Sequence, residues 1–388
     1  MIINKLYKNM KKTPIIGIDL GTTYCCASVY FENQIIIIPN ELGDRTTPSF
    51  VSFFDNNEKL VGTLAKERII EKQKLIYNSK RFRGRRFKDK EIQEDIKYLQ
   101  FKIIEDETQE KIKIKIENLD NLEKDQYYPE EISAILLKKI RNDAEFYLEQ
   151  KYKDLGLIQS EDKIIIKEVV ITVPAYFNQR QRKATQQAAE IAGLKVRKII
   201  NEPTAASLAY AYSEEDIGEN CLIFDFGGGT LDLTLLSYNS KQHICKILCS
   251  SGDTHLGGQD IDNKIYDIIK KKYKQQIENF YLNHNNFKDN KGEIRILKAC
   301  EKAKILLSSQ DEALIFIDSF LGEINIEYNL KKNELEEIVK EIFNKKIKEC
   351  LNNFIKKAKK NKNEIKNIIL VGGSTKITIL KDLIKDYF

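Results

Sequence analysis

Two short stretches far apart in the sequence share one pattern, and this repetition constrains the fold more than any other feature. The first is residues 18–23 (IDLGTT), and the second is residues 224–230 (FDFGGGT). In each stretch an aspartate interrupts an apolar run typical of a β-strand, and a glycine follows it closely. A carboxylate among apolar side chains is costly unless a cation satisfies it. Two matched copies therefore predict a duplicated architecture with a ligand site at each turn.

The residues that follow each aspartate are suited to binding an anion. Glycines at 21 and at 227–229 let the backbone turn tightly and bring its N–H groups against a phosphate. The threonines after them add hydroxyl groups for an anion or for water-mediated contact with a metal ion. We interpret the pair as two β-turn-β phosphate loops, although either copy alone fits an ordinary Asp-Gly hairpin equally well.

The bulk properties limit the class of protein. A chain of 388 residues is long enough for two domains or lobes. A net charge of +6 from 64 basic and 58 acidic residues, interleaved throughout, gives no indication of nucleic-acid binding. Seven cysteines without a C-x-x-C pair predict reduced thiols and a cytoplasmic location. No apolar run approaches the ~20 residues that span a bilayer, and residues 1–12 lack the apolar core of a secretory signal.

Three further segments contain charged or polar residues for which the local sequence allows two alternative roles. Five cations within residues 80–87 fit either an anion-binding loop or a solvated basic face. Glu202 follows a predicted strand and precedes a proline that opens a helix, so it either projects into a ligand crevice or caps that helix. Glu301, Lys304 and Ser308 form a polar stripe on a predicted helix, which faces either solvent or a ligand.

Hydrophobic periodicity predicts the main elements. The predicted helices are residues 60–70, 129–150, 178–192, 296–307 and a long amphipathic helix over 335–355. The predicted strands lie within 99–116, 169–174, 196–200, 221–251 and 368–371.

Eight motifs, in this order, resemble those of the ATPase domain of the 70-kDa heat-shock protein chaperones. They are GIDLGTTY (17–24), GDRTTPSFV (43–51), VPAYFN (173–178), INEPTAASLAYAY (200–212), IFDFGGGTLD (223–232), GDTHLGG (252–258), KACEKAK (298–304) and LVGGST (370–375). The resemblance covers nearly everything from residue 14 to residue 388. It implies an α/β fold of the actin-like, two-lobed ATPase type with duplicated ribonuclease H-like lobes.

The resemblance also implies a domain plan and partners. A tail (1–12) would precede lobe I (13–215) and lobe II (216–388), with ATP or ADP, Mg²⁺ and K⁺ bound between the lobes. The implied activity is slow ATP hydrolysis in a chaperone-type ATPase, assisted by J-domain co-chaperones and nucleotide-exchange factors. The family's final return segment and peptide-binding domain are not in the sequence, so we expect that this chain alone does not bind a client peptide.

Site roles follow from the resemblance one position at a time. Lys80 would position the attacking water and stabilise charge on the γ-phosphoryl group. Four acids (Asp19, Glu202, Asp225 and Asp232) would surround magnesium and potassium, mostly through water, and Thr230 would act with them in catalysis. The phosphates would be held by Gly21, Thr22, Thr23 and Tyr24 and by Gly227, Gly228, Gly229, Thr230 and Gly258. The remaining nucleotide contacts would be Glu301, Lys304, Ser308, Gly373, Ser374 and Lys376, and Pro174 and Arg182 would couple nucleotide state to a substrate domain.

Three departures from the family pattern bear on function. Ile305 and Lys376 occupy the positions of two arginines that sandwich adenine, so ATP affinity is expected to be below the family's. Gln259 replaces an acid near the phosphates, and residues 178–182 lose an acid and gain a cation. These changes keep open a second hypothesis, a non-hydrolysing or degenerate nucleotide-binding regulator of chaperones or co-chaperones. A third hypothesis is a sugar kinase, because the actin-like superfold hosts many reactions, although the eight motifs favour the chaperone ATPase.

Overall fold

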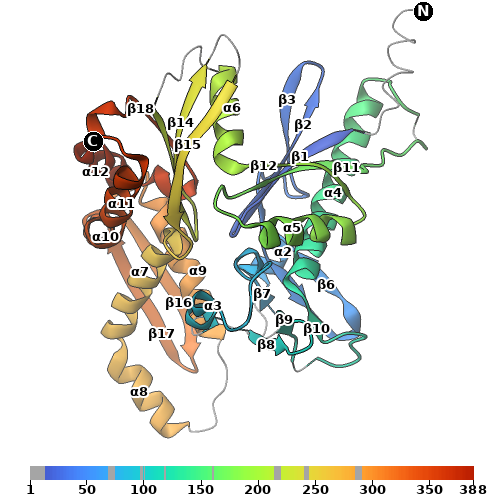
Figure 1. The fold of residues 1–388 in the computed structure, drawn as a ribbon. Coiled ribbons are helices and arrows are strands. Elements are labelled where there is room, and N and C mark those ends of the chain that lie inside the picture. Colours follow the sequence, from blue (N-terminus) through green and yellow to red (C-terminus); the bar gives the residue numbers. More distant parts are fainter. Residues whose placement is uncertain are drawn as a thin grey trace, which may run out of the picture. The chain divides into compact units, whose positions relative to one another are not determined.

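The computed structural model describes residues 14–68, 75–96, 99, 101–117, 119–159, 161–213, 220–239, 244–284 and 291–388 (Figure 1). The described chain divides into two compact units, unit 1 up to Glu202 and unit 2 from Pro203 onward. The division falls at the start of helix α6 (Glu202–Ser213), whereas the sequence prediction placed it after that helix. Helix α6 groups with unit 2 because Ala206 packs against the sheet of that unit. The tail predicted at 1–12 lies outside the described residues.

Unit 1 is built on a mixed sheet in the order β12-β11-β1-β2-β3, with β4 (Thr47–Pro48) beside β2. Its main strands are β1 (Ile15–Leu20), β2 (Tyr24–Phe31), β3 (Gln34–Ile38), β11 (Glu168–Val173) and β12 (Lys195–Asn201). Strand β1 pairs antiparallel with β2 and parallel with β11. Alternate residues of β1 are buried, so its other face is free to carry Asp19.

Two helices cover this sheet, α4 (Pro129–Asp154) and α5 (Gln179–Ile191), and they pack against each other (Figure 1). Helix α4 begins with proline followed by two acids, both favourable in a first turn. Its Leu137 packs with the sheet, whereas its Leu136 belongs to a second core. One long helix therefore joins the two cores of unit 1.

The second core of unit 1 lies among short strands. These are β5 (Val51–Phe53), β6 (Lys59–Val61), β7 (Leu75–Ile76), β8 (Lys102–Asp106), β9 (Lys111–Lys115) and β10 (Gln126–Tyr127), with helices α2 (Thr63–Glu67) and α3 (Lys90–Asp95). The helix predicted at 60–70 is wrong at its start, because residues 59–61 pair with β5 as a strand. Gly62 then adopts φ +73°, a left-handed conformation that separates this strand from the short helix α2.

Unit 2 repeats the central arrangement of unit 1. Its sheet runs in the order β15-β14-β13-β18, with β13 (Cys221–Phe226), β14 (Leu231–Asn239), β15 (Ile244–Asp253) and β18 (Asn367–Val371). Strand β13 pairs antiparallel with β14 and parallel with β18, as β1 does with β2 and β11. The aspartate-bearing strand is thus central in both sheets, and the duplication predicted from the two motifs is confirmed.

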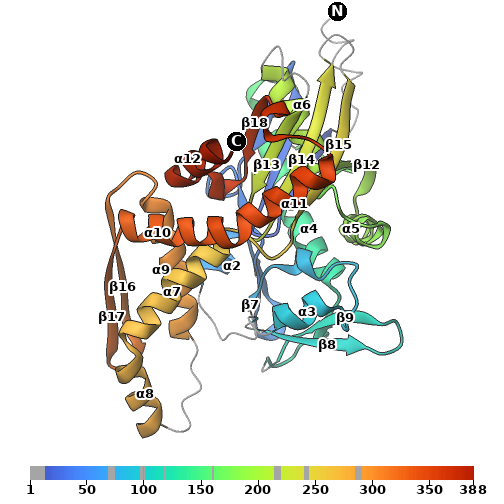
Figure 2. The same cartoon turned by 60° about the vertical axis from the view of Figure 1, so that its left-hand side comes forward.

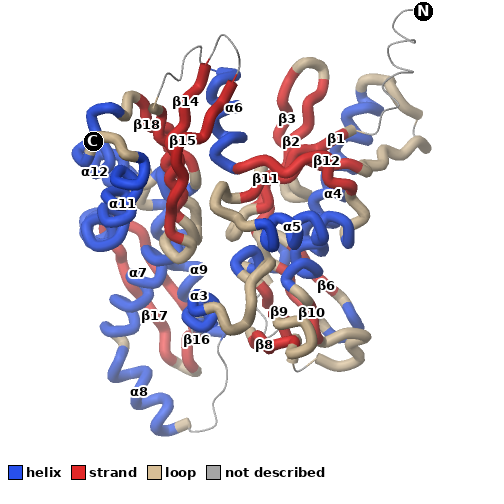
Figure 3. The backbone as a smooth tube through the Cα atoms, in the orientation of Figure 1, coloured by secondary structure: helices blue, strands red, loops and turns tan. Residues whose placement is uncertain are grey.

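Helices and one hairpin complete unit 2. The helices are α7 (Gly258–Lys272), α8 (Lys274–Asn283), α9 (Lys291–Leu306), α10 (Lys332–Ile342), α11 (Lys348–Ala358) and α12 (Thr378–Tyr387), and the hairpin is β16 (Glu312–Leu321) with β17 (Ile324–Lys331) (Figure 3). The long helix predicted at 335–355 is present as α10 and α11, which continue through a π-helical turn at Phe343–Ile347 (Figure 2). Within the residues that the structure describes, none of the helices has the length and apolar character needed to cross a membrane.

Candidate functional site

Unit 1 places Asp19 at the end of β1, directly before the first predicted phosphate turn. Thr172, its neighbour on β11, donates a hydrogen bond from Oγ1 to Asp19 Oδ1 at 3.0 Å. The turn itself is held by Ser49, whose Oγ donates to the Gly21 carbonyl at 2.9 Å and whose N–H donates to the Thr23 carbonyl at 2.8 Å. Both contacts use carbonyl oxygens of the turn and none of its N–H groups.

The other residues of this turn lie at the junction of β1 and β2. Thr22 and Thr23 are half-buried between the two strands, and Tyr24 begins β2 with 36% of its surface exposed. Lys66 on α2 donates from Nζ to the Tyr24 hydroxyl at 2.7 Å and lies over its ring. A cation therefore lies close to the end of the turn.

Lys80 and Glu202, 122 residues apart in the sequence, form a buried ion pair. Lys80 lies in a 3₁₀ turn (Ser79–Arg81), and its Nζ donates to Glu202 Oε1 at 2.7 Å. Only 8% of Lys80 is exposed, which excludes the solvated basic face as its environment. Glu202 is the first residue of α6 and follows β12 directly, so a strand end and a helix start together fix its carboxylate.

The electrostatics of Glu202 explain why a cation accompanies it. Burial raises the pKa of the Glu202 carboxyl, and the nearby Asp19 raises it further. Lys80 and Arg83 act in the opposite direction and favour the charged form. The two acids and Lys80 thus form one interacting group, which we call the unit 1 half-site.

Arg182 makes hydrogen bonds to the turn after β11 and to the end of β12, next to this half-site. Its guanidinium donates to the carbonyls of Ala175 and Phe177, which follow Pro174 at the end of β11. It also donates to Asn201 Oδ1 on β12 at 2.7 Å, directly before Glu202. Burial lowers the pKa of Arg182. Its contacts therefore link the proline turn to the strand end that carries Glu202.

The altered run at 178–182 retains a complete helix cap. Asn178 Oδ1 accepts from the N–H of Gln181 at 3.0 Å, and Gln181 Oε1 accepts from the N–H of Asn178 at 3.1 Å. This reciprocal pair satisfies two N–H groups at the start of α5. The lost acid and gained cation therefore leave the local geometry of α5 intact.

Unit 2 places two carboxylates face to face on the second hairpin. Asp225 on β13 pairs directly across the strands with Asp232 on β14, and Asp232 is only 5% exposed. Like charges at directly opposed positions of an antiparallel pair are destabilising unless a cation lies between them or near them. Among the described residues, no cluster of three or more His, Cys, Asp or Glu side chains could coordinate a metal directly. Two carboxylates fit Mg²⁺, which keeps several of its waters.

The second phosphate turn is braced by two other segments. Inside the turn, the Gly227 N–H donates to the Thr230 carbonyl at 3.0 Å. The start of α7 donates to it as well, from Gly258 N–H to the Gly227 carbonyl and from Gln259 N–H to the Gly228 carbonyl. Ser374 Oγ also donates to the Gly227 carbonyl, at 2.9 Å. The Gln259 contact uses its backbone, so the replacement of an acid there leaves this brace in place.

Gly257 is a site residue to which the sequence analysis assigned no role. A Cβ at this position would lie 2.5 Å from the Gly229 nitrogen and 2.6 Å from the Gly228 carbonyl oxygen. Both are backbone atoms of the phosphate turn, so only glycine allows this close approach. The paired glycines of the GDTHLGG motif carry the signal that could have identified it.

Lys304 lies in a buried polar cluster rather than on a solvent-facing stripe. Its Nζ, on α9, donates to Asp262 Oδ2 at 2.7 Å and to the Gly258 carbonyl at 3.1 Å. A Cβ on Gly258 would lie 2.3 Å from Ser374 Oγ and 3.1 Å from Lys304 Nζ. The structure therefore brings Gly258, Lys304 and Ser374 together around the second phosphate turn, in what we call the unit 2 half-site.

The remaining nucleotide candidates of unit 2 lie toward the surface. Glu301 lies one turn before Lys304 on α9, and Ser308 is exposed beyond the end of that helix. Gly373 and Lys376 are exposed in the turn after β18. Ile305 is 57% exposed near the end of α9.

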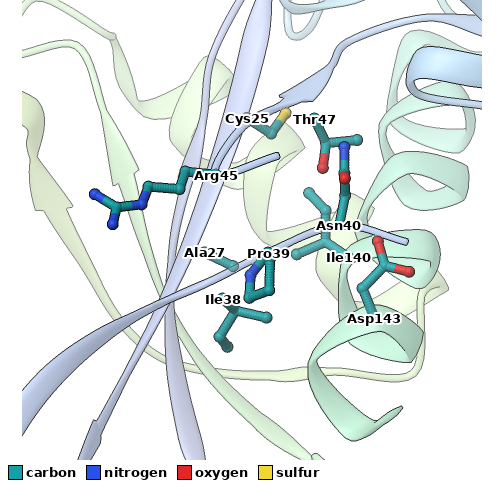
Figure 4. Close-up of a pocket in the computed structure, with 9 residues that line it drawn as sticks. All are labelled: Cys25, Ala27, Ile38, Pro39, Asn40, Arg45, Thr47, Ile140 and Asp143. Carbon is teal, nitrogen blue, oxygen red and sulfur yellow. The ribbon is translucent and has the colours of Figure 1, made fainter. Parts of the chain in front are cut away.

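A small cavity behind β2 is too small for a nucleotide. It lies between Cys25, Asn40, Thr47, Ile140 and Asp143, whereas the Arg45 side chain extends away from them (Figure 4). Its volume of about 10 Å³ corresponds to a single water molecule. Burial raises the pKa of the Cys25 thiol to about 11, so this sulfur is protonated at neutral pH.

Comparison with known proteins decides the family. The family model described as Hsp70 protein matches residues 15–388. The chain belongs to the Hsp70 family. Its fold is accordingly the actin-like, two-lobed ATPase fold, as the eight motifs predicted.

Three curated relatives of this Hsp70 chain show the same level of similarity. It is 39% identical over 378 residues to "Heat shock 70 kDa protein 2" of Paracoccidioides lutzii and to "Heat shock 70 kDa protein" of Neurospora crassa and of Emericella nidulans. Each match covers 97% of this chain and 54% of the relative. The chain therefore spans about half the length of the curated relatives it matches.

Proposed function

We propose that this chain is a chaperone-type ATPase domain that binds ATP with Mg²⁺ and hydrolyses it slowly to ADP and phosphate. The observation that carries the proposal is the buried Lys80–Glu202 ion pair, with its 2.7 Å contact, in the unit that also holds Asp19 and a phosphate turn. Burying an ion pair costs desolvation free energy, so its presence at a strand end favours a role in chemistry over one in stability.

Lys80 is the residue to which we assign the chemical step. Phosphoryl transfer depends mainly on positioning and on electrostatic stabilisation of charge that develops on the γ-phosphoryl oxygens. The Lys80 ammonium would donate to the attacking water and to that charge, and Glu202 holds the ammonium in place through Oε1. Thr172 fixes Asp19 in the same way, through the hydrogen bond to Oδ1.

The unit 2 half-site would hold the phosphates and the metal ion. Asp225 and Asp232 would bind Mg²⁺ through its water ligands, with K⁺ as a second cation of the site. When bound, Mg²⁺ would supply positive charge that neutralises the phosphate oxygens. Gly228 and Gly229 would supply N–H groups and Thr230 a hydroxyl group, whereas the Gly227 N–H closes the turn on the Thr230 carbonyl. The contacts from Gly258 and Ser374 hold the turn in one conformation.

The adenine contact is predicted to be weak and can be strengthened. Replacing Ile305→Arg together with Lys376→Arg should raise ATP affinity about tenfold, because two guanidinium stacking contacts of about 0.5–2 kcal/mol each are added. Equilibrium binding of ATP to both proteins measures the change. Ile268→Arg with Lys271→Arg, on the exposed face of α7, is the matched control. Equal affinity of all three proteins would remove residues 305 and 376 from the adenine site.

The proposal extends to partners and location. J-domain co-chaperones should stimulate hydrolysis and nucleotide-exchange factors should accelerate ADP release, as expected for a family member. Six cysteines in the described part of the chain form no disulfide, as expected for a cytoplasmic protein. Single-turnover hydrolysis of ATP in the presence of Mg²⁺ and K⁺ tests the activity, and addition of a J-domain protein to the same assay tests the partner.

A further inference from the structure

Unit 1 has a second concave site on its surface, outside the half-site that contains Lys80. It is a cavity of about 320 Å³ between the loop at 82–86, the start of β9 and the first turns of α5. This volume is at the lower end of the range of about 300–1,000 Å³ typical of small-molecule sites. Five cationic side chains line it: Arg85, Arg86, Lys111, Arg180 and Lys183. We call it the basic pocket.

The basic pocket carries more positive charge than its own acids neutralise. Its lining contains five cations but only two carboxylates, those of Glu110 and Glu130. The pair between Arg86 and Glu110, at 3.3 Å, is about half-exposed or more on both sides, and such pairs are weak and break readily. Arg180 and Lys183 are exposed, and neither makes an ion pair with any residue that the structure describes.

A buried arginine lies between two residues that line the pocket, although its own side chain is not part of the lining. Arg83, between the pocket residues Phe82 and Gly84, is only 1% exposed. Its Nε and Nη1 atoms have no hydrogen-bond partner within the described chain. Burial lowers the pKa of Arg83 to about 10, and three acidic groups oppose this effect: Glu130, which lines the pocket and acts most strongly, Cys25 and Glu202. The Arg83 guanidinium adds a positive charge near the pocket, and the same charge also acts on Glu202 in the unit 1 half-site.

The walls of the basic pocket are held at a fixed spacing. Gly84 adopts φ +64°, and a Cβ there would lie 2.7 Å from both the N and the Cα atoms of Gln181. The loop therefore rests directly on the backbone of α5, between its cations Arg180 and Lys183. Arg85 and Arg180 therefore come from two segments whose backbones are fixed against each other, which lowers the entropy lost on binding.

We propose that the basic pocket binds a small, multiply charged oxyanion, namely a phosphorylated metabolite or an oligophosphate. An arginine guanidinium can donate two parallel hydrogen bonds to two oxygens of one phosphate group. Five cations around one concave site also match a ligand that carries several negative charges. The loop that lines the pocket directly follows the 3₁₀ turn that carries Lys80, so occupancy of the pocket would regulate hydrolysis. This regulatory part rests on the proposed function, whereas the binding site does not.

Titration calorimetry with inorganic tripolyphosphate in metal-free buffer, with and without excess ADP, tests the site on the full chain. The pocket variant is Arg180→Glu with Lys183→Glu, and the matched control is Lys163→Glu with Lys167→Glu, which makes the same charge change on exposed residues elsewhere in unit 1. We expect binding that persists in ADP and weakens about tenfold or more in the pocket variant only. Equal affinity in all three proteins, or complete competition by ADP, would overturn the site. If ADP does not bind, the tripolyphosphate affinities of the pocket variant and the control variant still show whether the basic pocket is the binding site.

Single-turnover hydrolysis tests the regulatory part. With Mg²⁺ in excess, tripolyphosphate is expected to change the rate for the unmodified chain and for the control, but not for the pocket variant. Thermal unfolding of all three proteins establishes that the exposed substitutions leave the fold intact. An unchanged rate for the unmodified chain with tripolyphosphate bound would overturn regulation and leave the binding site standing.

Discussion

Lys80→Ala is expected to lower the single-turnover rate of ATP hydrolysis by about 100-fold or more, while ATP affinity changes by less than about threefold. The Lys80 ammonium is assigned to the charge that develops on the γ-phosphoryl group, so its loss acts on the transition state. Ground-state binding depends on the phosphate turns and on the adenine contacts, which the substitution does not touch. Rapid-quench hydrolysis and equilibrium nucleotide binding on the same preparation separate the two effects.

The ion pair requires a second variant, because Lys80→Ala leaves the Glu202 carboxylate buried without its cation. The pair Lys80→Met with Glu202→Gln removes both charges and keeps the volume, so it should fold as stably as the unmodified chain and remain inactive. Lys198→Ala, an exposed lysine on β12, is the control and should hydrolyse ATP normally. Unchanged turnover in both Lys80 variants would exclude Lys80 from the mechanism.

Gly257→Ala is expected to weaken ATP binding about tenfold or more, since the added methyl group would force the second phosphate turn out of position. The Cβ would lie 2.5 Å from the Gly229 nitrogen and 2.6 Å from the Gly228 carbon, and both neighbours are backbone atoms. The φ of Gly257 is −164°, an extended conformation that any residue adopts, so the effect is steric. Equilibrium binding of ATP with Mg²⁺ measures it.

Gly156→Ala is the control for this substitution. Gly156 follows α4 at φ +66°, and an added Cβ has no atom within 4 Å, so the change strains only the backbone. We expect it to lower the free energy of unfolding by about 1 kcal/mol and to leave ATP affinity unchanged. Equal ATP affinity of Gly257→Ala and Gly156→Ala would show that the second turn does not hold the phosphates.

The sequence could predict the parts of the fold that depend on local patterns. Residues 18–23 and 224–230 indicate their hairpins because an apolar run, an aspartate and glycines determine strand and turn within a few residues. The helical period over 335–355 likewise predicts α10 and α11, although not the π-helical turn between them. The error at residues 60–62 arose because a short apolar segment fits a strand or a helix equally well, and pairing with β5 decides the outcome.

The sequence could not predict contacts that depend on tertiary packing. The local sequence around Lys80 fits both an anion-binding loop and a solvated basic face. Only the fold, which brings Glu202 Oε1 within 2.7 Å of Lys80 Nζ, distinguishes the two. The same holds for Lys304, whose partner Asp262 lies on another helix. The brace at Gly257 and the basic pocket were also missed, because each depends on the distance between segments that are remote in the chain.

Single-turnover hydrolysis of ATP, with protein in excess and Mg²⁺ and K⁺ present, tests the central claim most directly. The control is Asp225→Ala, which removes one of the two opposed carboxylates of unit 2. We predict that the unmodified chain converts bound ATP to ADP and that Asp225→Ala does not. Absence of hydrolysis by a folded chain that binds ATP would contradict the account and would favour a non-hydrolysing regulator of chaperones.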